Sequence, residues 1–489
     1  MFNKIKSFLT ENKTLSQTVI KNTFWMSVGQ ITSRVIRAVL IIYAARILGA
    51  AGYGAFSYAL SLAGFFTIFA DIGLTPLLTR DTSKNPALRN QYIGTAFVIK
   101  LGLLAISSAI ILAAYPALNK ITEAAPLLPL IVLLFAFDSV RDFTFAITRS
   151  LEKMEMEAGI NVFTNIAILV LGVAILVSNP TSLGLMTAYT IGAGLGTILS
   201  FWKLRNFFSG FWKYFNSKLV KPILTEAWPF GVVGLLNTIM LNTDTIMLSW
   251  FRPAQEIGFY AVAQRIVVLL YLLPGFIAVS TMPAMSRFVA AEFERFQNIL
   301  KKAVRGALLL GFPLMAGGII VAKELITLLF GKEYEAAAPI FQVLLLTLPV
   351  IFPGFMFNTA IFATNKQKYL LGGFALGAVG NVILNLILIP PYGGVGSAIG
   401  TIITQVLNNG LNGFILYSLL KVKFWGNFHQ IVIATVIMAA LVFGLKVLGL
   451  NVLLNIVLGA LAYFSVLYLL REPLLGSISS QFKRGLSGE

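Results

Sequence analysis

The chain has 489 residues, of which 57% are hydrophobic and only 11% are charged. An average soluble domain carries about 25% charged residues, so the composition excludes a soluble globular enzyme. The formal net charge of +18 raises the question of a nucleic-acid partner, which the placement of the basic residues answers below. The chain contains no cysteine, which excludes disulfides, thiolate metal sites and a cysteine nucleophile. The N-terminal residues lack an apolar run followed by a cleavage site, so we expect no cleavable signal peptide.

Apolar runs long enough to cross a bilayer recur along the whole chain. A membrane-crossing helix needs ~20 mostly apolar residues, whereas membrane-crossing strands would alternate polar and apolar residues. The sequence therefore predicts an all-α integral membrane protein with about 14 transmembrane helices. The ninth expected span is interrupted by Lys323 and Glu324 and has the weakest signal. The expected spans are 23–48, 54–79, 92–116, 126–148, 158–178, 183–202, 228–250, 257–286, 303–330, 338–363, 369–390, 395–420, 430–449 and 451–470.

The basic residues are concentrated in alternate loops. If the N-terminal tail is cytoplasmic, that side holds 26 of the 37 lysines and arginines, the opposite side holds five, and the spans hold six. Because cytoplasmic loops carry an excess of basic residues, this split predicts a multi-pass protein of the cytoplasmic (inner) membrane with both termini cytoplasmic. With acidic residues included, the cytoplasmic segments carry +16, the outer loops zero and the spans +2. The net charge thus mainly reflects orientation, and we expect no nucleic-acid partner.

The chain contains a weak internal duplication. The segment Gly54–Ala59 opens the second span and is similar to Gly258–Ala263, which opens the eighth. Asn161 and Asn165 on the fifth span correspond to Asn381 and Asn385 on the eleventh. We therefore expect two parallel-repeat six-helix lobes plus two appended helices, an organisation used by transporters. The expected domains are an N-lobe at 1–202, a basic aromatic interlobe cytoplasmic segment at 203–226, a C-lobe at 227–420, and appended spans 13 and 14 with a cytoplasmic tail at 421–489.

The interlobe segment combines basic and aromatic residues. Phe207, Phe211 and Phe215 recur at i, i+4 and i+8, which fits a helix that lies on the anionic cytoplasmic leaflet. An ordinary basic linker that follows the excess of positive charge on the cytoplasmic side explains the pattern equally well.

Charged residues inside the spans are the main candidates for function. Each would cost roughly 2.5–3.5 kcal/mol at the bilayer centre if it faced lipid, so each must face a cavity, form a pair or reach the interface. Gln30, Arg34 and Arg37 form one polar stripe on the first span. We expect either a cationic patch facing a cavity or a pairing with Asp71 or Asp244. Arginine binds phosphate in a bidentate manner, so a cavity patch would favour an anionic substrate.

Most of the other charged positions in the spans have two interpretations each. Arg265 on the eighth span is a candidate for the same cationic cavity, and it could instead reach the interface. Asp138, Arg141 and Asp142 on the fourth span are spaced for pairing within one helix. Together with Asp71 and Asp244, they are also the candidates for coupling to an H+ or Na+ gradient. Lys100 is expected to reach the cytoplasmic interface.

A neutral polar stripe follows the twelfth span. Thr401, Gln405, Asn408 and Asn412 lie at i, i+4, i+7 and i+11, and the stripe is too long for exposure to lipid. Hydrogen-bonding side chains of this kind suit the hydroxyl groups of a glycan, and they equally suit packing between helices.

The sequence shows no sign of catalysis. The only histidine, His429, lies where the thirteenth span meets the cytoplasmic face. We find no metal-ligand cluster, no phosphate-binding loop and no long extramembrane segment. We therefore expect no enzyme activity, no metal and no cofactor, and any energy for transport would come from an ion gradient, the membrane potential or the flux of substrate.

Several short motifs together resemble the polysaccharide-transporter (Wzx-like) flippases of the multidrug/oligosaccharidyl-lipid/polysaccharide exporter superfamily. The motifs are Lys21–Trp25, Ala45–Gly49, Gly52–Gly54, Ala70–Leu74, Thr243-Asp244, Gly258–Ala261 and the pattern around Asn381, Pro391 and Gly396. With the fourteen expected spans, the resemblance extends over nearly the whole chain.

The resemblance implies a protein that moves an undecaprenyl-diphosphate-linked oligosaccharide from the cytoplasmic to the outer leaflet by alternating access. Two lobes would form a V around a cationic cavity, in which Arg34 and Arg37 fit the role of diphosphate ligands by position and type. Related lipid II flippases have a lipid groove at their extra helices, which spans 13 and 14 would match. The expected partners are membrane lipids, the lipid-linked glycan, and polysaccharide polymerase and glycosyltransferase proteins, with the flippase acting as a monomer.

Two other functions are compatible with parts of this pattern. A cation-coupled multidrug exporter would share the fold and would depend on an acid in the membrane, such as Asp244. A membrane polymerase or ligase acting on lipid-linked glycans would need a large outer loop, and the outer loops here are short.

Overall fold

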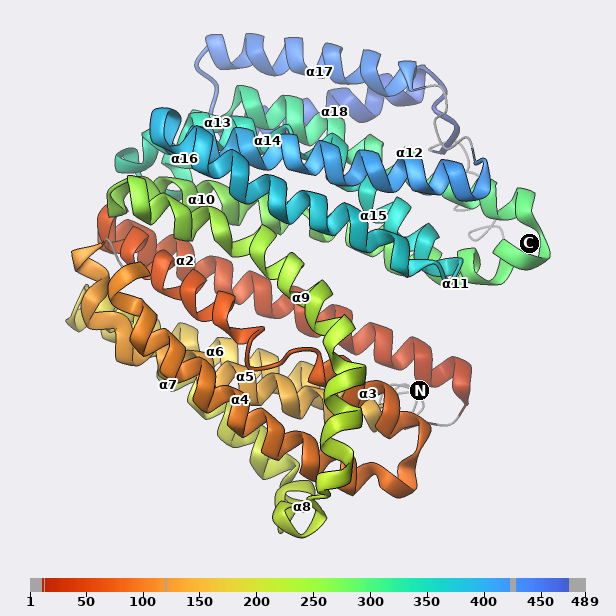
Figure 1. Ribbon diagram of the computed structural model, residues 1–489. Helices are drawn as coiled ribbons and strands as arrows, with labels where there is room; N and C mark the ends of the chain where they lie inside the picture. Colours follow the sequence, from red (N-terminus) through yellow and green to blue (C-terminus); the bar gives the residue numbers. More distant parts are fainter. Residues whose placement is uncertain (1–10, 13, 119–120, 423–427, 475–489) are drawn as a thin grey trace. The chain divides into compact units, whose positions relative to one another are not determined.

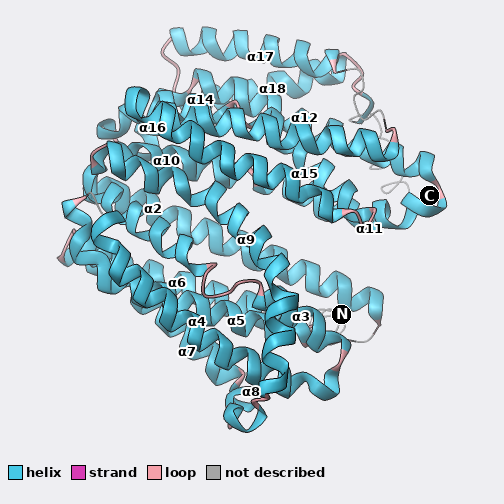
Figure 2. Cartoon of the chain, in the orientation of Figure 1, coloured by secondary structure: helices cyan, strands magenta, loops and turns pink. Residues whose placement is uncertain are grey.

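The computed structural model describes residues 11–12, 14–118, 121–422 and 428–474. Within these ranges the chain is almost entirely helical and contains no strand (Figure 2). The prediction of an all-α protein is therefore confirmed. Packing divides the chain into two compact units, residues 1–258 and 259–489, which are described separately below.

The helices follow the predicted order of spans (Figure 1). In the first unit they are α2 (Leu15–Thr67), α3 (Leu74–Lys84), α4 (Arg89–Leu118), α5 (Leu128–Ser150), α6 (Met154–Ser178), α7 (Ser182–Lys203), α8 (Arg205–Phe208) and α9 (Ser217–Phe251). Helix α10 (Ala254–Leu270) begins in the first unit and continues in the second. The second unit continues with α11 (Leu272–Ala291), α12 (Phe293–Ile320), α13 (Ala322–Phe330), α14 (Ala338–Leu345), α15 (Leu348–Ala363), α16 (Leu370–Leu420), α17 (His429–Val447) and α18 (Val452–Leu469).

Most of these helices are suited to a membrane. Eleven helices of the described chain are long and apolar enough to cross one, or up to 12 if the bent pair Lys332–Leu345 and Leu348–Ala363 forms a single span. The multi-pass architecture is thus confirmed, whereas the count of fourteen stays a prediction. The ninth expected span, 303–330, is divided between α12 and α13, and the break lies beside the charged residues that weakened its signal.

Two helices are each interrupted by a glycine. Gly49 in α2 has φ 65° and ψ 176°, and Gly393 in α16 has φ 57° and ψ −133°. These conformations are accessible to glycine and are not helical. In α16 the halves pack side by side, because a Cβ on Gly400 would lie 3.3 Å from the Cβ of Leu384. Helices α2 and α16 therefore each extend over two of the expected spans.

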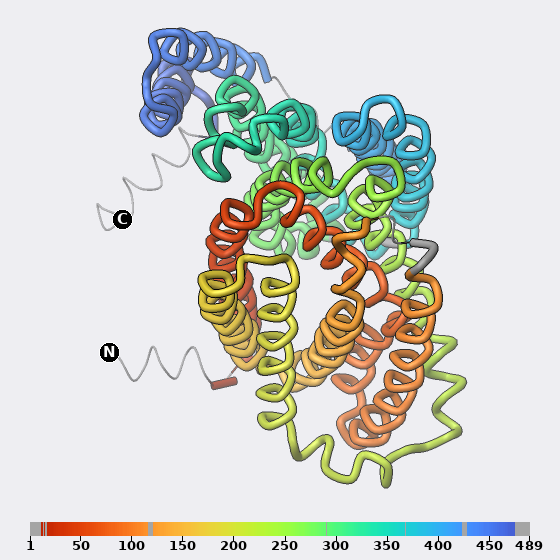
Figure 3. Tube along the Cα trace, turned by 90° about the vertical axis from the view of Figure 1, so that its left-hand side faces the viewer, coloured from red at the N-terminus to blue at the C-terminus, as the bar shows by residue number. Residues whose placement is uncertain are grey.

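In the first unit, α6 packs along the first half of α2 (Figure 3). The buried Lys21 forms an ion pair with Glu155 at 3.1 Å near the start of both helices. Further along, a Cβ on Gly172 would lie 2.8 Å from Leu40. Contacts advance in the same direction along both helices, so α2 and α6 run parallel, as the first and fifth spans must if consecutive spans alternate in direction.

The repeated glycine motif is a site of close backbone contact. A Cβ on Gly54 would lie 2.8 Å from the backbone nitrogen of Gly258 and would overlap the carbonyl oxygen of Ala254. A Cβ on Gly258 would in turn overlap the carbonyl oxygen of Ala50. Both copies of the motif therefore contribute to one crossing, between the second half of α2 and the start of α10.

The expected interlobe helix is interrupted. Helix α8 ends at Phe208, Gly210 adopts φ 73°, and the 3-10 turn η3 (Phe211–Tyr214) follows. As a result, the phenylalanines at i, i+4 and i+8 do not share one continuous helix. The boundary between the two units lies after Gly258, and α9 packs against α2, α3 and α4 in the first unit. The predicted division into four domains stays a prediction.

In the second unit, α12 packs against α11, α15 and α17, and α17 pairs with α18. Buried side chains from α17 and α18 contact the end of α12, with Met438, Val442 and Tyr463 at the centre of this cluster. The two appended helices thus share a hydrophobic core with the rest of the unit.

Candidate functional site

The polar stripe predicted on the first span is present on α2. Gln30, Arg34 and Arg37 are all exposed. Arg37 Nε donates a hydrogen bond of 3.1 Å to the side-chain oxygen of Asn165 on α6, and Asn165 in turn donates to the carbonyl oxygen of Asn161 at 2.8 Å. Arg34 makes no ion pair within the described residues. The stripe therefore presents two guanidinium groups, and the Asn165 amide orients that of Arg37.

Asp71 does not pair with these arginines in the structure. It lies in the turn between α2 and α3, and its Oδ1 is 3.4 Å from Nζ of Lys100 on α4. The hydroxyl of Thr75 donates to the same carboxylate at 2.6 Å. Lys100, which was expected to reach the cytoplasmic interface, is fully buried, so that expectation is wrong. The pairing with Asp71 explains why a lysine is tolerated there.

The pairing predicted within the fourth span is present on α5. Arg141 Nη2 lies 2.6 Å from Asp138 Oδ1, at i, i+3. Arg141 is buried, and its Nε and Nη1 have no hydrogen-bond partner among the described residues. Asp142 interacts electrostatically with Arg141, Asp138, Lys100 and Asp71. We call these five residues the charge cluster. Its three carboxylates outnumber its two cations by one.

The remaining acid of the spans lies apart on α9. Asp244 is 1% exposed and is flanked by the buried Thr243 and Thr245. In the second unit, Arg265 on α10 is half-buried, and its Nε is buried without a hydrogen-bond partner in the described part of the chain.

The stripe on the twelfth span participates in helix packing. Asn408 and Asn412 are buried, and Asn412 Nδ2 donates to the side-chain oxygens of Asn358 on α15 at 3.1 Å and Asn408 at 3.2 Å. Gln405 accepts a hydrogen bond from Asn409 at 3.0 Å, and Thr401 is half-buried. Interhelical amide bonds of this kind hold membrane helices together. Contact of the stripe with a glycan stays a prediction.

A large apolar pocket was missed by the sequence analysis. Its volume is about 310 Å³, and it lies between α10, α12, α17 and α18 of the second unit. Representative lining residues are Leu270, Pro313, Gly317, Met438 and Phe464. The pocket is formed by helices that are far apart in the sequence. The only local signal is the small side chains on facing helices, such as Gly317.

Two ion pairs link the helices around this pocket, one on either side of the lining residues. At one end Arg305 on α12 binds Glu472, beyond α18, and donates to Gln430 on α17 at 2.6 Å. At the other end Lys446 on α17 lies 3.0 Å from Glu324 on α13. The appended helices are therefore fixed to α12 and α13 near both ends, while the contact between them is apolar.

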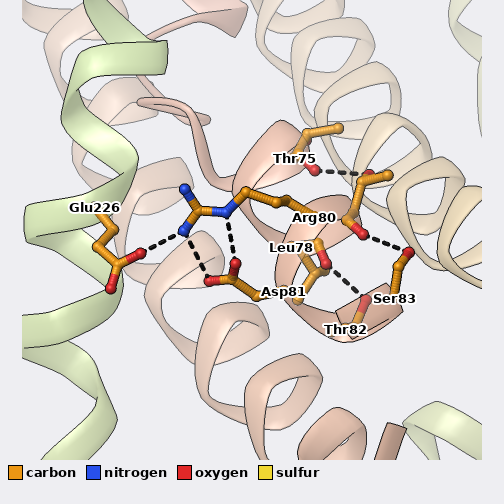
Figure 4. A network of polar contacts seen from close by, with 8 residues as sticks. Thr75, Leu78, Arg80, Asp81, Thr82, Ser83 and Glu226 are labelled. Atoms are coloured by element: carbon orange, nitrogen blue, oxygen red, sulfur yellow. Dashed lines mark hydrogen bonds and ion pairs between the residues drawn. The ribbon is translucent and has the colours of Figure 1, made fainter. Parts of the chain in front are cut away.

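A second polar network was also missed (Figure 4). Arg80 on α3 binds Asp81 at 2.6 Å and Glu226 on α9, and its guanidinium lies 5.8 Å from the ring centroid of Phe230. The hydrogen bond with Asp81 raises the pKa of Arg80, so the network retains its charge. It ties α3 to α9 at the end of the second expected span. Among the described residues, no group of three or more histidine, aspartate and glutamate side chains is arranged to hold a metal ion.

The sequence matches two protein-family models and a glycan-flippase relative. A family model described as "Polysaccharide biosynthesis protein" matches residues 19–289, and the MatE model matches residues 229–389. The chain is 22% identical over 449 residues to the probable low-salt glycan biosynthesis flippase Agl15 of Haloferax volcanii, and the match covers 89% of this chain and 92% of the relative.

Two solved structures show the fold. The lipid II flippase MurJ in an inward-closed conformation superposes with a TM-score of 0.74 at 19% identity, covering 92% of this chain and 99% of MurJ. An inward-facing multidrug resistance MATE family transporter of the MOP superfamily superposes with a TM-score of 0.63 at 15% identity, covering 78% of this chain and 94% of that one. The fold is therefore that of the MOP superfamily transporters.

Proposed function

The chain belongs to the polysaccharide biosynthesis protein family, and on this premise we propose that it is a flippase for an anionic polyprenyl-diphosphate-linked oligosaccharide. The glycan would cross the cytoplasmic membrane by alternating access and serve the synthesis of cell-surface polysaccharide. The similarity to the probable low-salt glycan biosynthesis flippase Agl15, over 89% of this chain, supports the proposal. The sidedness of the basic residues supports an inner-membrane location with both termini cytoplasmic.

The observation that carries the proposal is the pair Arg34 and Arg37 on α2. Both side chains are exposed although they lie within an apolar helix, and the Asn165 amide orients Arg37. Guanidinium groups form strong bidentate contacts with phosphate oxygens. Two such groups one turn apart suit the two phosphates of a diphosphate, which is the common feature of lipid-linked glycans irrespective of their sugars.

The apolar pocket of the second unit supports a lipid-linked substrate. The hydroxyl groups of a glycan would find few hydrogen-bond partners in a cavity of about 310 Å³ that is lined by leucine, methionine and phenylalanine side chains. A polyprenyl chain is a hydrocarbon that gains free energy when it leaves polar surroundings for such a surface. The pocket lies at α17 and α18, which we expect to correspond to the extra helices that form a lipid groove in lipid II flippases.

Transport would draw its energy from an H+ or Na+ gradient or from the membrane potential. In the charge cluster the carboxylates outnumber the cations by one, and the Asp142 side chain is exposed. The extra carboxylate would need a proton or a cation for neutrality within the membrane, which supports this energy source. Asp142 is the best candidate for that carboxylate, because Lys100 and Arg141 already have Asp71 and Asp138 as close partners. We further propose that the protein acts as a monomer with no cofactor. Its protein partners would be polysaccharide polymerase and glycosyltransferase proteins.

The direct test in cells replaces both arginines. Arg34→Ala combined with Arg37→Ala should abolish surface glycan while the amount of protein in the membrane stays normal. The matched control, Arg287→Ala combined with Arg471→Ala, removes two exposed arginines outside the expected spans and should leave the glycan unchanged. Unimpaired glycan export by the Arg34/Arg37 variant would refute the proposal.

The second candidate function is a cation-coupled multidrug exporter of the same fold. The match of the MatE model to residues 229–389 and the negative charge cluster favour it. It predicts that expression confers drug resistance, which Asp142→Asn or Asp244→Asn removes, whereas the Arg34/Arg37 variant retains it.

A further inference from the structure

A basic and aromatic surface lies on the connection between α7 and α9. Trp212 is 63% exposed and Trp202 is 57% exposed. The residues that form this surface are Trp202, Lys203, Arg205, Trp212, Lys213, Tyr214 and Phe215. We call them the connector surface.

The opposite side of the connection is anchored in the first unit. Phe211 packs edge-on against Phe97 with ring centroids 4.9 Å apart. The backbone nitrogen of Asn216 donates to the hydroxyl of the buried Thr95 at 3.0 Å. A Cβ on Gly94 would lie 2.8 Å from the carbonyl oxygen of Phe211, so α4 admits this close approach because residue 94 is glycine. The connector surface is therefore held in a defined orientation.

The positive charge of the connector surface is not neutralised by the protein. Lys203, Arg205 and Lys213 make no ion pair with any carboxylate in the described ranges. No aspartate or glutamate occurs between Glu157 and Glu226. The ammonium of Lys203 lies 4.8 Å from the ring centroid of Trp202 and remains exposed. Unpaired cations of this kind attract an anionic partner.

We propose that the connector surface binds the anionic headgroups of membrane phospholipids. The connection runs from the end of α7 to the start of α9. Because both helices are long and apolar enough to cross a membrane, the connection lies at a membrane face. Tryptophan and tyrosine favour that interface, and neighbouring lysines and arginines favour anionic lipid. An acidic protein would match the charge but would leave the exposed indole rings unexplained. This inference concerns the lipid environment and does not rest on the proposed transport function.

The test measures which phospholipid gathers at the connector. Because the chain has no cysteine, Ser209→Cys provides a single exposed attachment point for a fluorophore. The labelled full-length protein is reconstituted in phosphatidylcholine nanodiscs that contain a small fraction of spin-labelled lipid. Quenching is compared between spin-labelled phosphatidylglycerol and spin-labelled phosphatidylcholine with the same acyl chains. We expect phosphatidylglycerol to quench roughly fivefold more effectively at equal concentration.

Two double variants assign the effect to the connector surface. Lys203→Gln with Lys213→Gln should bring the quenching by the two lipids to equality. The control, Lys301→Gln with Lys302→Gln, removes two exposed lysines of α12 and should retain the preference. Equal quenching in the unsubstituted protein, or loss of the preference in the control pair as well, would overturn the proposal. Strong binding of polyglutamate with no lipid preference would likewise overturn it, in favour of an acidic protein partner.

Discussion

The two units differ in how they accommodate polar groups inside apolar helices. The first unit contains ionisable side chains, namely the arginine pair of α2 and the charge cluster, which includes Lys100 and Asp142. The second unit contains contacts between neutral amides, such as Asn412 bound to Asn358, together with the charged Arg265 of α10 and the apolar pocket. Under the proposed function, a charged headgroup would contact the first unit and a hydrocarbon chain would contact the second.

Two positions that correspond in the expected duplication illustrate this difference. Asn165 on α6 accepts a hydrogen bond from Arg37, whereas the corresponding Asn385 on α16 donates to Asn381 at 3.2 Å. The same residue type at the same place in the repeat therefore orients a cation in one unit and another amide in the other.

The largest expected effect comes from removing the buried cation of the first unit. Lys100→Met leaves Asp71 without its ion-pair partner, and breaking a buried pair costs about 3–5 kcal/mol of unfolding free energy. Urea or thermal unfolding of the purified protein in detergent measures the loss. Combining Lys100→Met with Asp71→Asn should restore most of it, because the double variant has the same excess of carboxylates over cations as the unsubstituted protein. No change in the single variant would mean that the charges of the first unit do not determine its stability.

A moderate effect is expected from filling the pocket of the second unit. Gly317 lines the pocket, and a Cβ there would lie at van der Waals distance, 3.5 Å, from Met438. Gly317→Leu should therefore occupy space needed by a polyprenyl chain and reduce flipping roughly tenfold, which corresponds to about 1.4 kcal/mol. Flipping of a fluorescent polyprenyl-diphosphate glycan in proteoliposomes provides the measurement.

The control for pocket filling is Leu346→Phe, which enlarges an exposed side chain of the second unit outside the pocket. Equal flipping by the Gly317 variant and the unsubstituted protein would separate the pocket from the transport path.

The smallest effect is expected from the amide network of the second unit. Asn412→Ala removes the bonds to Asn358 and Asn408, and interhelical hydrogen bonds in membranes contribute about 0.6 kcal/mol on average. The same unfolding experiment as for Lys100 should therefore show a small shift. If Asn412→Ala lowered the unfolding free energy as much as Lys100→Met does, polar contacts would contribute equally in the two units, contrary to the account.

The sequence is sufficient to predict the features that depend on local periodicity. Apolar runs predict the helices, and the spacing of Gln30, Arg34 and Arg37 predicts a shared face. Breaks at Gly49 and Gly393 fall between expected spans, where glycine permits the conformation. The predicted pair of Asp138 and Arg141 is present because its partners are one turn apart on one helix.

Features that join distant segments are not predictable from the sequence in this way. Lys100 binds Asp71 because a turn after α2 meets α4, and no spacing rule relates the two. The pocket of the second unit likewise requires the packing of α12 against α17 and α18. The interlobe phenylalanines suggested a continuous helix because their spacing is helical, but Gly210 ends that helix and turns Phe211 inward onto Phe97.

The central claim is that Arg34 and Arg37 of the first unit bind the diphosphate of the substrate. The most direct measurement is the affinity of the purified protein for a short-chain polyprenyl diphosphate and for the matching uncharged polyprenol. We expect the diphosphate to bind more tightly, and Arg34→Ala with Arg37→Ala to weaken its binding by at least about tenfold, since contacts to charged groups contribute about 1.5–3 kcal/mol. Binding of the polyprenol should not change. Undiminished binding of the diphosphate by the double variant would contradict the account.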